Sequence, residues 1–210
     1  MPLVAREHTA LTSLLTRTAD NAAFYAVLTG ADAVRDISEK MGYCDEPRYR
    51  LIRVDRRLDK AGDNEFEIAL VDDAEKTVAY YDKVTLLHFP KVSSRYVARN
   101  QVWRSAAMRH SLVLRDVSLK VLFRYLVQEY DLLLTEDAVK GVGKFYWHRQ
   151  VSRAIALGLH VYTYEDAAQS LRPIPTQRVL NDIVDLAWSG ADQGSLQALI
   201  SRFPLASQKA

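Results

Sequence analysis

The middle of the chain alternates continuous apolar runs with stretches whose apolar residues recur every three or four positions. Short apolar runs are typical of buried strands, and the three-to-four spacing is typical of one face of a helix. These segments follow one another in the order 102–108, 115–130, 131–134, 144–158 and 160–162. The pattern predicts strand, helix, strand, helix, strand, which is the alternation of a parallel α/β layer.

Antiparallel strands are predicted before this layer. Residues 49–54 alternate loosely, and residues 65–71 and 77–87 alternate polar and apolar positions on either side of a polar turn at 72–76. Two such runs joined by five turn residues predict an antiparallel hairpin.

Helices are predicted near both ends of the chain. Apolar spacing predicts one helix over residues 8–29, capped by Gly30, and a short one over 33–40. A third helix is predicted over 176–188. Two further short segments, an extended linker and a terminal helix or strand, are predicted at 171–175 and 195–202.

This organisation predicts a main domain over residues 1–165 and a helical extension over 166–210 that packs on it. The extension could mediate a homodimer or could shape a binding site for a second substrate. The sequence leaves both roles open.

Composition narrows the class of protein. With 28 basic and 26 acidic residues the formal net charge is +2, which argues against a generally basic nucleic-acid binder, although a local patch stays possible. The one cysteine, Cys44, excludes an internal disulfide and suits a reducing compartment. No apolar run approaches the roughly 20 residues of a membrane span, and the start of the chain does not resemble a signal peptide. We therefore expect a soluble cytoplasmic protein with no membrane partner.

Several common site motifs are missing. The run GVGK at 141–144 lacks the spacing of a phosphate-binding P-loop, so nucleotide hydrolysis is not expected. No H-x-x-x-H or C-x-x-C pair supports a metal site, and no G-x-S-x-G supports a serine hydrolase.

Polar and charged residues instead gather at the ends of two of the predicted strands. Glu136 and Asp137 follow the middle strand of the α/β layer, at the edge where open α/β sheets bind ligands. Both are candidates for a general base, although helix capping and loop solvation explain either one alone. A basic cluster precedes the first helix of the layer and suits phosphate binding or a solvated rim; it consists of Arg104, Arg109, His110 and Arg115.

The order of elements over residues 1–165 resembles the Gcn5-related N-acetyltransferase (GNAT) family. In that family a loop of pattern R/Q-x-x-G-x-G/A holds the pyrophosphate of acetyl-CoA at a helix start, where backbone N–H groups are available. The matching stretch here is 115–120, with Arg115 at the arginine position and Ser118 and Lys120 in place of the glycines. The resemblance implies an α/β (α+β) fold: a mixed, mostly antiparallel sheet with a central parallel βαβ unit and helices on both faces.

The resemblance also implies a function. It implies an N-acetyltransferase that uses acetyl-CoA as co-substrate and acetylates a protein lysine or a small amine. The pantetheine would enter a splayed gap between the two strands that flank the loop. The residues that would bind acetyl-CoA are Arg109, Arg115, Ser118, Leu119 and Lys120.

The catalytic residues of the GNAT family are less closely matched in this sequence than its phosphate loop. Glu136 or Asp137 would serve as the base. Ala154 occupies the position of the family's general-acid tyrosine, so Tyr146 or Tyr162 would have to replace it. Residues 135–147 also resemble divergent acetyltransferase-like proteins of bacteriophages. The alternative is therefore a catalytically inactive GNAT-like protein that binds a protein partner, such as a phage–host interaction module.

Overall fold

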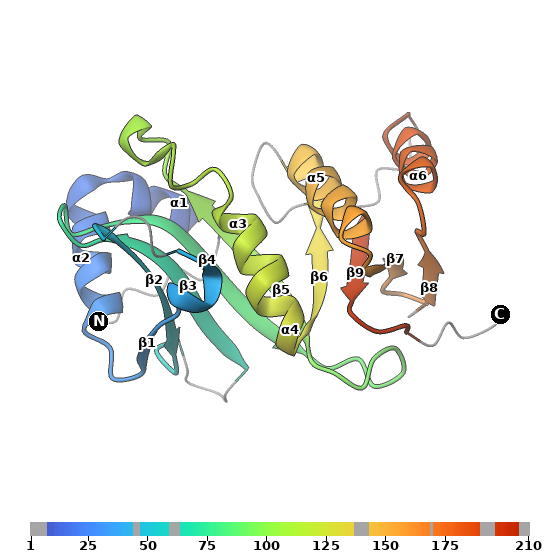
Figure 1. Cartoon of the computed structure of the whole chain (residues 1–210), viewed down its shortest axis with the longest axis horizontal. Coiled ribbons are helices and arrows are strands. Elements are labelled where there is room, and N and C mark those ends of the chain that lie inside the picture. Colours follow the sequence, from blue (N-terminus) through green and yellow to red (C-terminus); the bar gives the residue numbers. More distant parts are fainter. Residues whose placement is uncertain are drawn as a thin grey trace. The chain divides into compact units, whose positions relative to one another are not determined.

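The structure, a computed structural model, describes residues 8–43, 47–58, 64–136, 143–168, 170–189 and 196–205. These residues form a mixed, mostly antiparallel sheet and several helices, so the predicted fold class holds at this level (Figure 1). The helices are α1 (His8–Thr16), α2 (Thr18–Thr29), α3 (Val117–Lys120), α4 (Val127–Glu129), α5 (Gly143–Ala156) and α6 (Gln177–Ser189). None of these helices combines the length and the apolar composition that a membrane crossing requires.

Nine strands are described, in the spatial order β1-β2-β3-β4-β5-β6-β9-β7-β8. Their bounds are β1 (Val34–Asp36), β2 (Tyr49–Asp55), β3 (Glu65–Asp72), β4 (Thr77–Leu87), β5 (Val97–Arg104), β6 (Asp131–Thr135), β7 (His160–Glu165), β8 (Ser170–Pro173) and β9 (Gln197–Ser201).

The N-terminal helices differ from the prediction in two ways. The helix predicted over 8–29 is broken at Arg17 into α1 and α2, and Gly30 caps α2 as expected. The short helix predicted over 33–40 is wrong: β1 pairs with β2, and a single 3-10 turn follows at Glu39–Met41. Pairing with the edge of β2 satisfies the backbone of this segment, and such tertiary contacts override weak local propensity.

The predicted hairpin is confirmed with nearly the predicted bounds. Strands β2, β3 and β4 pair antiparallel, with Phe66 opposite Val84 and a register shift between Leu70 and Val71. Strand β3 is buried after its first residue, and β4 is buried except at Lys83 and over its last three residues.

A parallel pair is present as predicted, but its first strand has other bounds: β5 ends at Arg104, so residues 105–108 of the predicted strand lie outside it. Strand β5 begins at Val97 rather than at residue 102, and it pairs parallel with β6 from Val97 opposite Asp131 to Arg99 opposite Leu133. The connection between them is helical from 117 to 129, with a π-helical stretch at Val121–Leu126 between α3 and α4.

The third strand of the predicted parallel layer has different neighbours. β7 runs in the same direction as β6 but lies two places away, because β9 is inserted between them and pairs antiparallel with both. The segment predicted as an extended linker forms β8, which pairs with β7. The region predicted as a helical extension therefore contains two sheet strands as well as α6.

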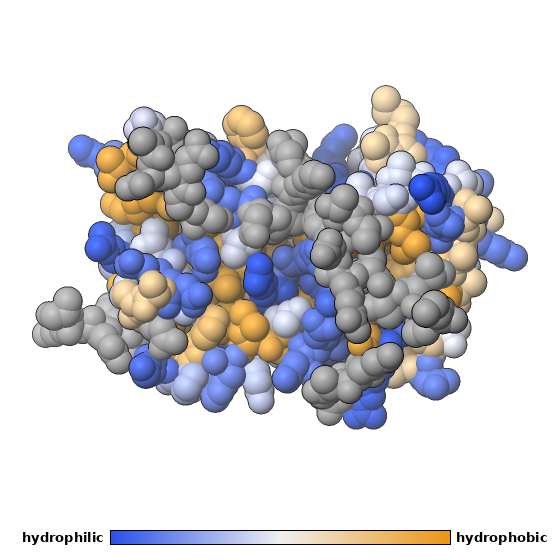
Figure 2. Space-filling model, turned by 180° about the vertical axis from the view of Figure 1, so that it is seen from behind, coloured by the Kyte–Doolittle hydropathy of each residue, from blue (hydrophilic) through white to orange (hydrophobic). Residues whose placement is uncertain are grey.

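The chain divides into two compact units. Unit 1 comprises residues 1–85 and 100–124, and unit 2 comprises residues 86–99 and 125–210. Unit 1 has an apolar core in which α1 and α2 pack on strand residues such as Ile52, Ala69 and Tyr81. Unit 2 has its own core, formed by Val97, Leu133, Tyr162, Tyr164 and Leu199 with neighbouring apolar residues. On the face shown in Figure 2, the coloured apolar residues lie in separate patches between polar ones.

Candidate ligand pocket before helix α3

Unit 1 contains a pocket of about 210 Å³ beside the start of α3. One wall is formed by Gly42 and Tyr43. The other wall comes from the end of the β5–α3 loop and from α3: Leu112, Val113, Asp116, Val117 and Lys120. The volume is below the range usual for drug-sized ligands, so the pocket suits a small group or one part of a larger molecule.

Gly42 brings the backbone of the first wall close to α3. It follows the 3-10 turn in the left-handed conformation, with φ of 59°, and its N–H donates to the carbonyl of Glu39. A Cβ atom placed there would lie 2.9 Å from Nη1 of Arg124. Both the conformation and the space therefore favour glycine at this position.

We expect Gly42→Ala to destabilise the protein by about 1–2 kcal/mol from the left-handed conformation alone, with an added cost for moving Arg124. Gly158→Ala is the matched control, because Gly158 has φ of 73° but no atom within 4 Å of the place that a Cβ would take. Urea unfolding of both variants should show the larger loss for Gly42→Ala. Equal losses would mean that the Arg124 contact contributes nothing.

The second wall is held in place by hydrogen bonds to the loop backbone. The hydroxyl of Tyr43 donates to the carbonyl of Val113, and Nη2 of Arg104 donates to the carbonyl of Leu114 over 2.8 Å. Leu114 itself is buried, and its N–H donates to the carbonyl of His110. The loop that lines the pocket is thus tied to unit 1 at several points.

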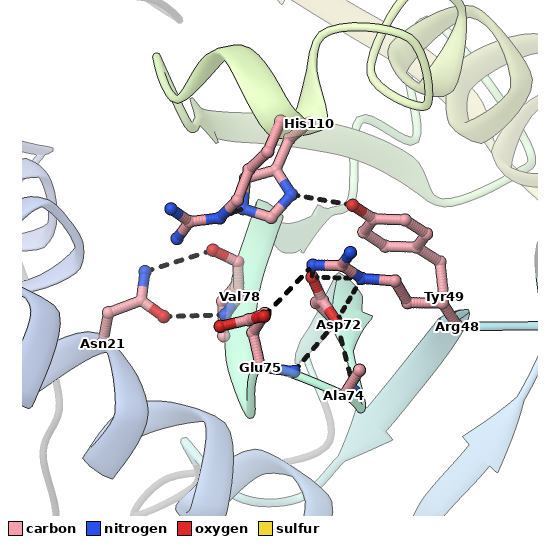
Figure 3. A network of polar contacts seen from close by, with 9 residues as sticks. Asn21, Arg48, Tyr49, Asp72, Ala74, Glu75, Val78 and His110 are labelled. Atoms are coloured by element: carbon pink, nitrogen blue, oxygen red, sulfur yellow. Dashed lines mark hydrogen bonds and ion pairs between the residues drawn. The ribbon is translucent and has the colours of Figure 1, made fainter.

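His110 anchors the same loop through its side chain. Its ring is buried, with Nδ1 3.0 Å from the hydroxyl of Tyr49 and Nε2 3.2 Å from Nε of Arg109 (Figure 3). Because a guanidinium can only donate, Nε2 is the acceptor, and the neutral ring carries its proton on Nδ1 and donates it to Tyr49. Burial and the charge of Arg109 lower the pKa of His110, while Asp72 opposes the shift. The neutral imidazole is favoured.

A second anchor lies next to Tyr49. Asp72 is buried and accepts hydrogen bonds from Arg48 and from the N–H groups of Ala74 and Glu75, which close the β3–β4 turn (Figure 3). Burial works to raise the pKa of Asp72, but the bonds from Arg48 and Glu75 outweigh it and leave that pKa below its usual value. This network fixes the turn rather than presenting a reactive group.

The polar groups of the pocket are of opposite sign. Nζ of Lys120 donates to the carbonyl of Gly42 over 3.0 Å and lies 4.6 Å from the centre of the Tyr43 ring. Asp116 supplies a carboxylate to the same pocket. The ammonium is thus positioned by the opposite wall, and its other N–H donors can bond to a ligand anion while the Gly42 bond is kept.

The structure separates the other predicted acetyl-CoA residues. Of the five, Lys120 lines the pocket, Arg109 contacts His110, and Arg115 is exposed. Ser118 is buried, with no hydrogen-bond partner for its hydroxyl within the described part of the chain, and Leu119 is half-buried. The stretch chosen from sequence therefore coincides with a pocket, but Asp116 and Val117 line it in place of most of the chosen residues.

The predicted catalytic residues belong to unit 2. Glu136 exchanges two bonds with Leu196: its N–H donates to the carbonyl of Leu196, and its carboxylate accepts from the N–H of Leu196 over 3.2 Å. Tyr146 lies on α5 and its hydroxyl oxygen is buried. Asp137 lies outside the described residues, as do Lys140 and Gly141. Glu136 thus joins the end of β6 to the residue before β9.

Besides Asp72, the sequence interpretation missed two further buried carboxyl groups in unit 1. Asp82 of β4 is fully buried and accepts a hydrogen bond from Nδ2 of Asn100 on β5 over 2.6 Å and a longer one from Tyr80. Burial raises the pKa of Asp82 to about 7. A charged residue in the middle of an apolar strand was the signal that could have indicated it.

The second missed group is Glu67 of β3, which is also fully buried. It accepts hydrogen bonds from Arg57, one of them 2.7 Å long, and from the hydroxyl of Tyr81 over 2.6 Å. The guanidinium of Arg57 lies 5.1 Å from the centre of the Phe24 ring, so this ion pair also contacts α2. Burial and the neighbouring Glu67 raise the pKa of Tyr81 well above its ordinary value.

Comparison with protein-family models, with curated proteins and with solved structures found no significant match for this chain.

Proposed function

We propose that the chain is an N-acetyltransferase of the GNAT-like kind, which binds acetyl-CoA and transfers its acetyl group to an amine. The observation that carries the proposal is the pocket itself, since the start of the helix that joins parallel strands β5 and β6 lines it. In open α/β layers, ligands bind where a strand leads into the following helix, because helix starts offer free N–H groups and a positive dipole end.

The pairing of the strands on either side of this helix also supports the proposed acetyltransferase. The parallel register of β5 and β6 covers three residue pairs, and β5 then continues to Arg104. Strand β9 pairs antiparallel with β6 and with β7, so the sheet is mixed around the parallel pair.

The proposed chemistry is acyl transfer. The amine nitrogen bonds to the thioester carbon, the carbon–sulfur bond breaks, and the proton lost by the amine is finally returned to the leaving thiolate. Lys120 and the start of the helix would bind phosphate groups, and Glu136 or Asp137 would accept the proton from the amine. The acceptor is a protein lysine or a small amine.

Calorimetric titration with acetyl-CoA tests the proposal. We expect binding in the micromolar range and about tenfold weaker binding for Lys120→Gln, because a hydrogen bond to a charged phosphate is lost. Arg17→Gln is the control, since Arg17 is an exposed basic residue of unit 1 whose guanidinium lies 3.7 Å from the carboxylate of Asp20. No heat and no thermal shift at millimolar acetyl-CoA would exclude the enzyme.

A second candidate, a catalytically inactive protein-binding module, is favoured by one observation. Met108 and Leu112 are 84% and 63% exposed, and both lie in the loop that leads to the pocket. Exposed apolar residues can form part of a protein interface. Acetyl-CoA binding without release of free thiol in the presence of varied amines would favour this candidate over the enzyme.

A further inference from the structure

Helices α5 and α6 lie side by side on one face of the sheet of unit 2 (Figure 1). Helix α5 joins β6 to β7, and α6 joins β8 to β9. Each helix joins two strands of the same direction, because β9 is antiparallel to both β6 and β7, and β8 is antiparallel to β7. The two crossovers run in opposite directions both along the strands and across the sheet, so right-handed connections put both helices on the same face.

The outward face of α5 is basic. The residues of α5 that face the sheet are buried: Gly143, Trp147, Val151 and Ala154. Phe145, Arg149 and Arg153 follow one another at four-residue steps on the opposite side of the helix, and all three are exposed. The exposed fraction of Phe145 is 76%, and α5 contains no aspartate or glutamate.

The outward face of α6 is mainly acidic. Leu180 and Val184 are buried on the inner side of this helix. The residues exposed on the other side include one cation, two carboxylates and an apolar side chain: Arg178, Asp182, Asp185 and Leu186. Leu186 is 77% exposed.

Charges of opposite sign on the two helices are left unpaired. Four charged side chains form no ion pair within the described part of the chain: Arg149, Arg153, Asp182 and Asp185. We define the α5–α6 face by these four residues together with Phe145 and Leu186. The face thus presents cations on one helix, anions on the neighbouring helix and an exposed apolar residue on each.

One hydrogen bond shows which residues of the two helices lie at the same level. Oγ of Ser152 donates to Oε1 of Gln177 over 2.5 Å, so the start of α6 lies beside the second half of α5. The helices are antiparallel, because each runs back against the strand before it and β6 and β8 have opposite directions. Counting about 1.5 Å per residue in opposite directions from this bond puts Asp182 near the level of Arg149 and Leu186 near that of Phe145.

We propose that the α5–α6 face binds a second copy of this chain and forms a two-fold symmetric dimer. A two-fold interface uses the same patch on both copies, so the patch must be complementary to itself. An axis parallel to the helices places α5 of each copy over α6 of the other. Arg149 then faces Asp182 of the other copy, and Phe145 faces Leu186, and symmetry makes each contact twice.

The distribution of charge favours a second copy over other partners. A nucleic acid or an acidic protein would meet Asp182 and Asp185 as well as the arginines, and like charges in contact oppose binding. A second copy instead pairs each sign with its opposite. The face lies in unit 2, and the proposal does not depend on the acetyl-CoA pocket of unit 1.

Sedimentation velocity of the native chain over a range of concentrations tests the proposal. We expect a dimer with a dissociation constant of about 10 µM, because two helix faces about 20 Å long form a small interface. The dimer should weaken at about 1 M salt, since exposed charges are then screened.

Charge reversal identifies the residues that meet. Arg149→Asp and Asp182→Arg should each weaken the dimer about a hundredfold, because symmetry replaces two attractive contacts by two repulsive ones. Arg178 lies near the level of Arg153, where the two-fold brings like charges together, so Arg178→Glu should tighten the dimer. Arg172→Asp is the control, since Arg172 is an exposed basic residue on β8 of the same unit, and this variant should dimerise like the native chain. Circular dichroism should show unaltered folding for all four variants.

Mixing the two weakened variants separates a direct contact from an indirect effect. In a mixed dimer of Arg149→Asp with Asp182→Arg, the two new residues face each other and the two native residues face each other. Both contacts are then attractive again, and we expect a dimer within about tenfold of the native dissociation constant. A variant that had merely lost its fold would not be rescued in this way.

Three results would overturn the proposal. The first is a native chain that stays monomeric at about 100 µM, a concentration at which even a weak specific dimer is populated. The second is an equally tight dimer in Arg149→Asp, which would put the interface on another surface. The third is a mixture of the two weakened variants that stays monomeric, which would show that Arg149 and Asp182 do not face each other.

Discussion

Asp82→Asn should make the protein more stable than the native form at pH 8 and nearly equal to it at pH 4. The carboxyl of Asp82 is fully buried, and burial raises its pKa from 3.8 to about 7. A group whose pKa is higher in the folded state contributes stability below its unfolded pKa, and this contribution is lost as pH rises to the folded pKa. Three pKa units correspond to about 4 kcal/mol between pH 4 and pH 7.

The neutral acid also suits the partners of Asp82. Oδ1 of Asp82 and Oδ1 of Asn100 both lack a donor within the described part of the chain when the carboxyl is ionised. A protonated Asp82 can donate one hydrogen bond while it accepts the one from Asn100. Asparagine at position 82 has nearly the same size and a hydrogen-bond donor, but it cannot ionise. The variant therefore does not lose stability at high pH.

Urea unfolding at several pH values measures this difference. His110 has the opposite effect on stability, because its pKa is lowered in the folded state. Its contribution to the stability of the fold is present above pH 6.5 and is lost as the pH falls below that value. Asp82→Asn should therefore leave a stability that rises with pH through the His110 range. The exposed Asp182→Asn is the control and should follow the native pH profile. A pH-independent difference between Asp82→Asn and the native protein would show that folding does not raise the pKa of Asp82.

Arg57→Met should destabilise unit 1 by about 3–5 kcal/mol, the usual cost of leaving a buried charge without its partner. Glu67 is fully buried, and the side chain of Arg57 is only 8% exposed. Methionine fills much of the same space beside Phe24 but cannot neutralise the carboxylate. The hydroxyl of Tyr81 would still donate to Glu67, but it carries no positive charge.

The double variant Arg57→Met/Glu67→Leu separates two contributions to the free energy of unfolding: the stabilisation by the ion pair itself, and the penalty for leaving Glu67 buried without a partner. Replacing both charges removes the unpaired carboxylate, so most of the loss should be recovered in urea unfolding. Arg35→Met is the control for an ion pair on the surface: Arg35 is 59% exposed and bonds Asp55, and its loss should cost less than about 1 kcal/mol. Additive effects of the two changes in the double variant would contradict the predicted coupling.

The hairpin of β3 and β4 could be predicted from the sequence because its information is local. The alternation of Glu65–Asp72 and the polar turn after it specify both the strand and the register of its neighbour. The parallel pair was predicted for the same reason, from a short apolar strand that follows an amphipathic helix. The start of β5 was missed because polar Arg99 and Asn100 interrupt its apolar pattern, although Asn100 is buried against Asp82.

The position of β9 could not be predicted in this way. Its sequence, Gln197–Ser201, is compatible with a strand or a short helix, and its two partners lie far away along the chain. Only its pairing with both β6 and β7 favours the strand over the helix. β1 shows the same limit on a smaller scale, since its strand conformation comes from pairing with β2.

The candidate pocket was predictable in part. The resemblance to the GNAT phosphate loop pointed to the stretch 115–120, and part of the pocket lies there. The opposite wall, Gly42 and Tyr43, comes from a distant segment that carries no local signal of binding. The buried carboxyl groups were missed for another reason: charged residues are normally exposed, and their partners Arg57 and Asn100 are set by the fold.

The insertion of β9 has a consequence for synthesis of the chain on the ribosome. Leu132 of β6 and Val161 of β7 both pair with Ile200, so neither strand finds this neighbour until residue 200 has left the exit tunnel. Until then the nascent chain carries two apolar strands with unpaired edges, which is the state most prone to association with other chains. The sheet of unit 2 is thus completed late in translation, whereas the β2–β3–β4 strands of unit 1 find their partners as soon as they emerge.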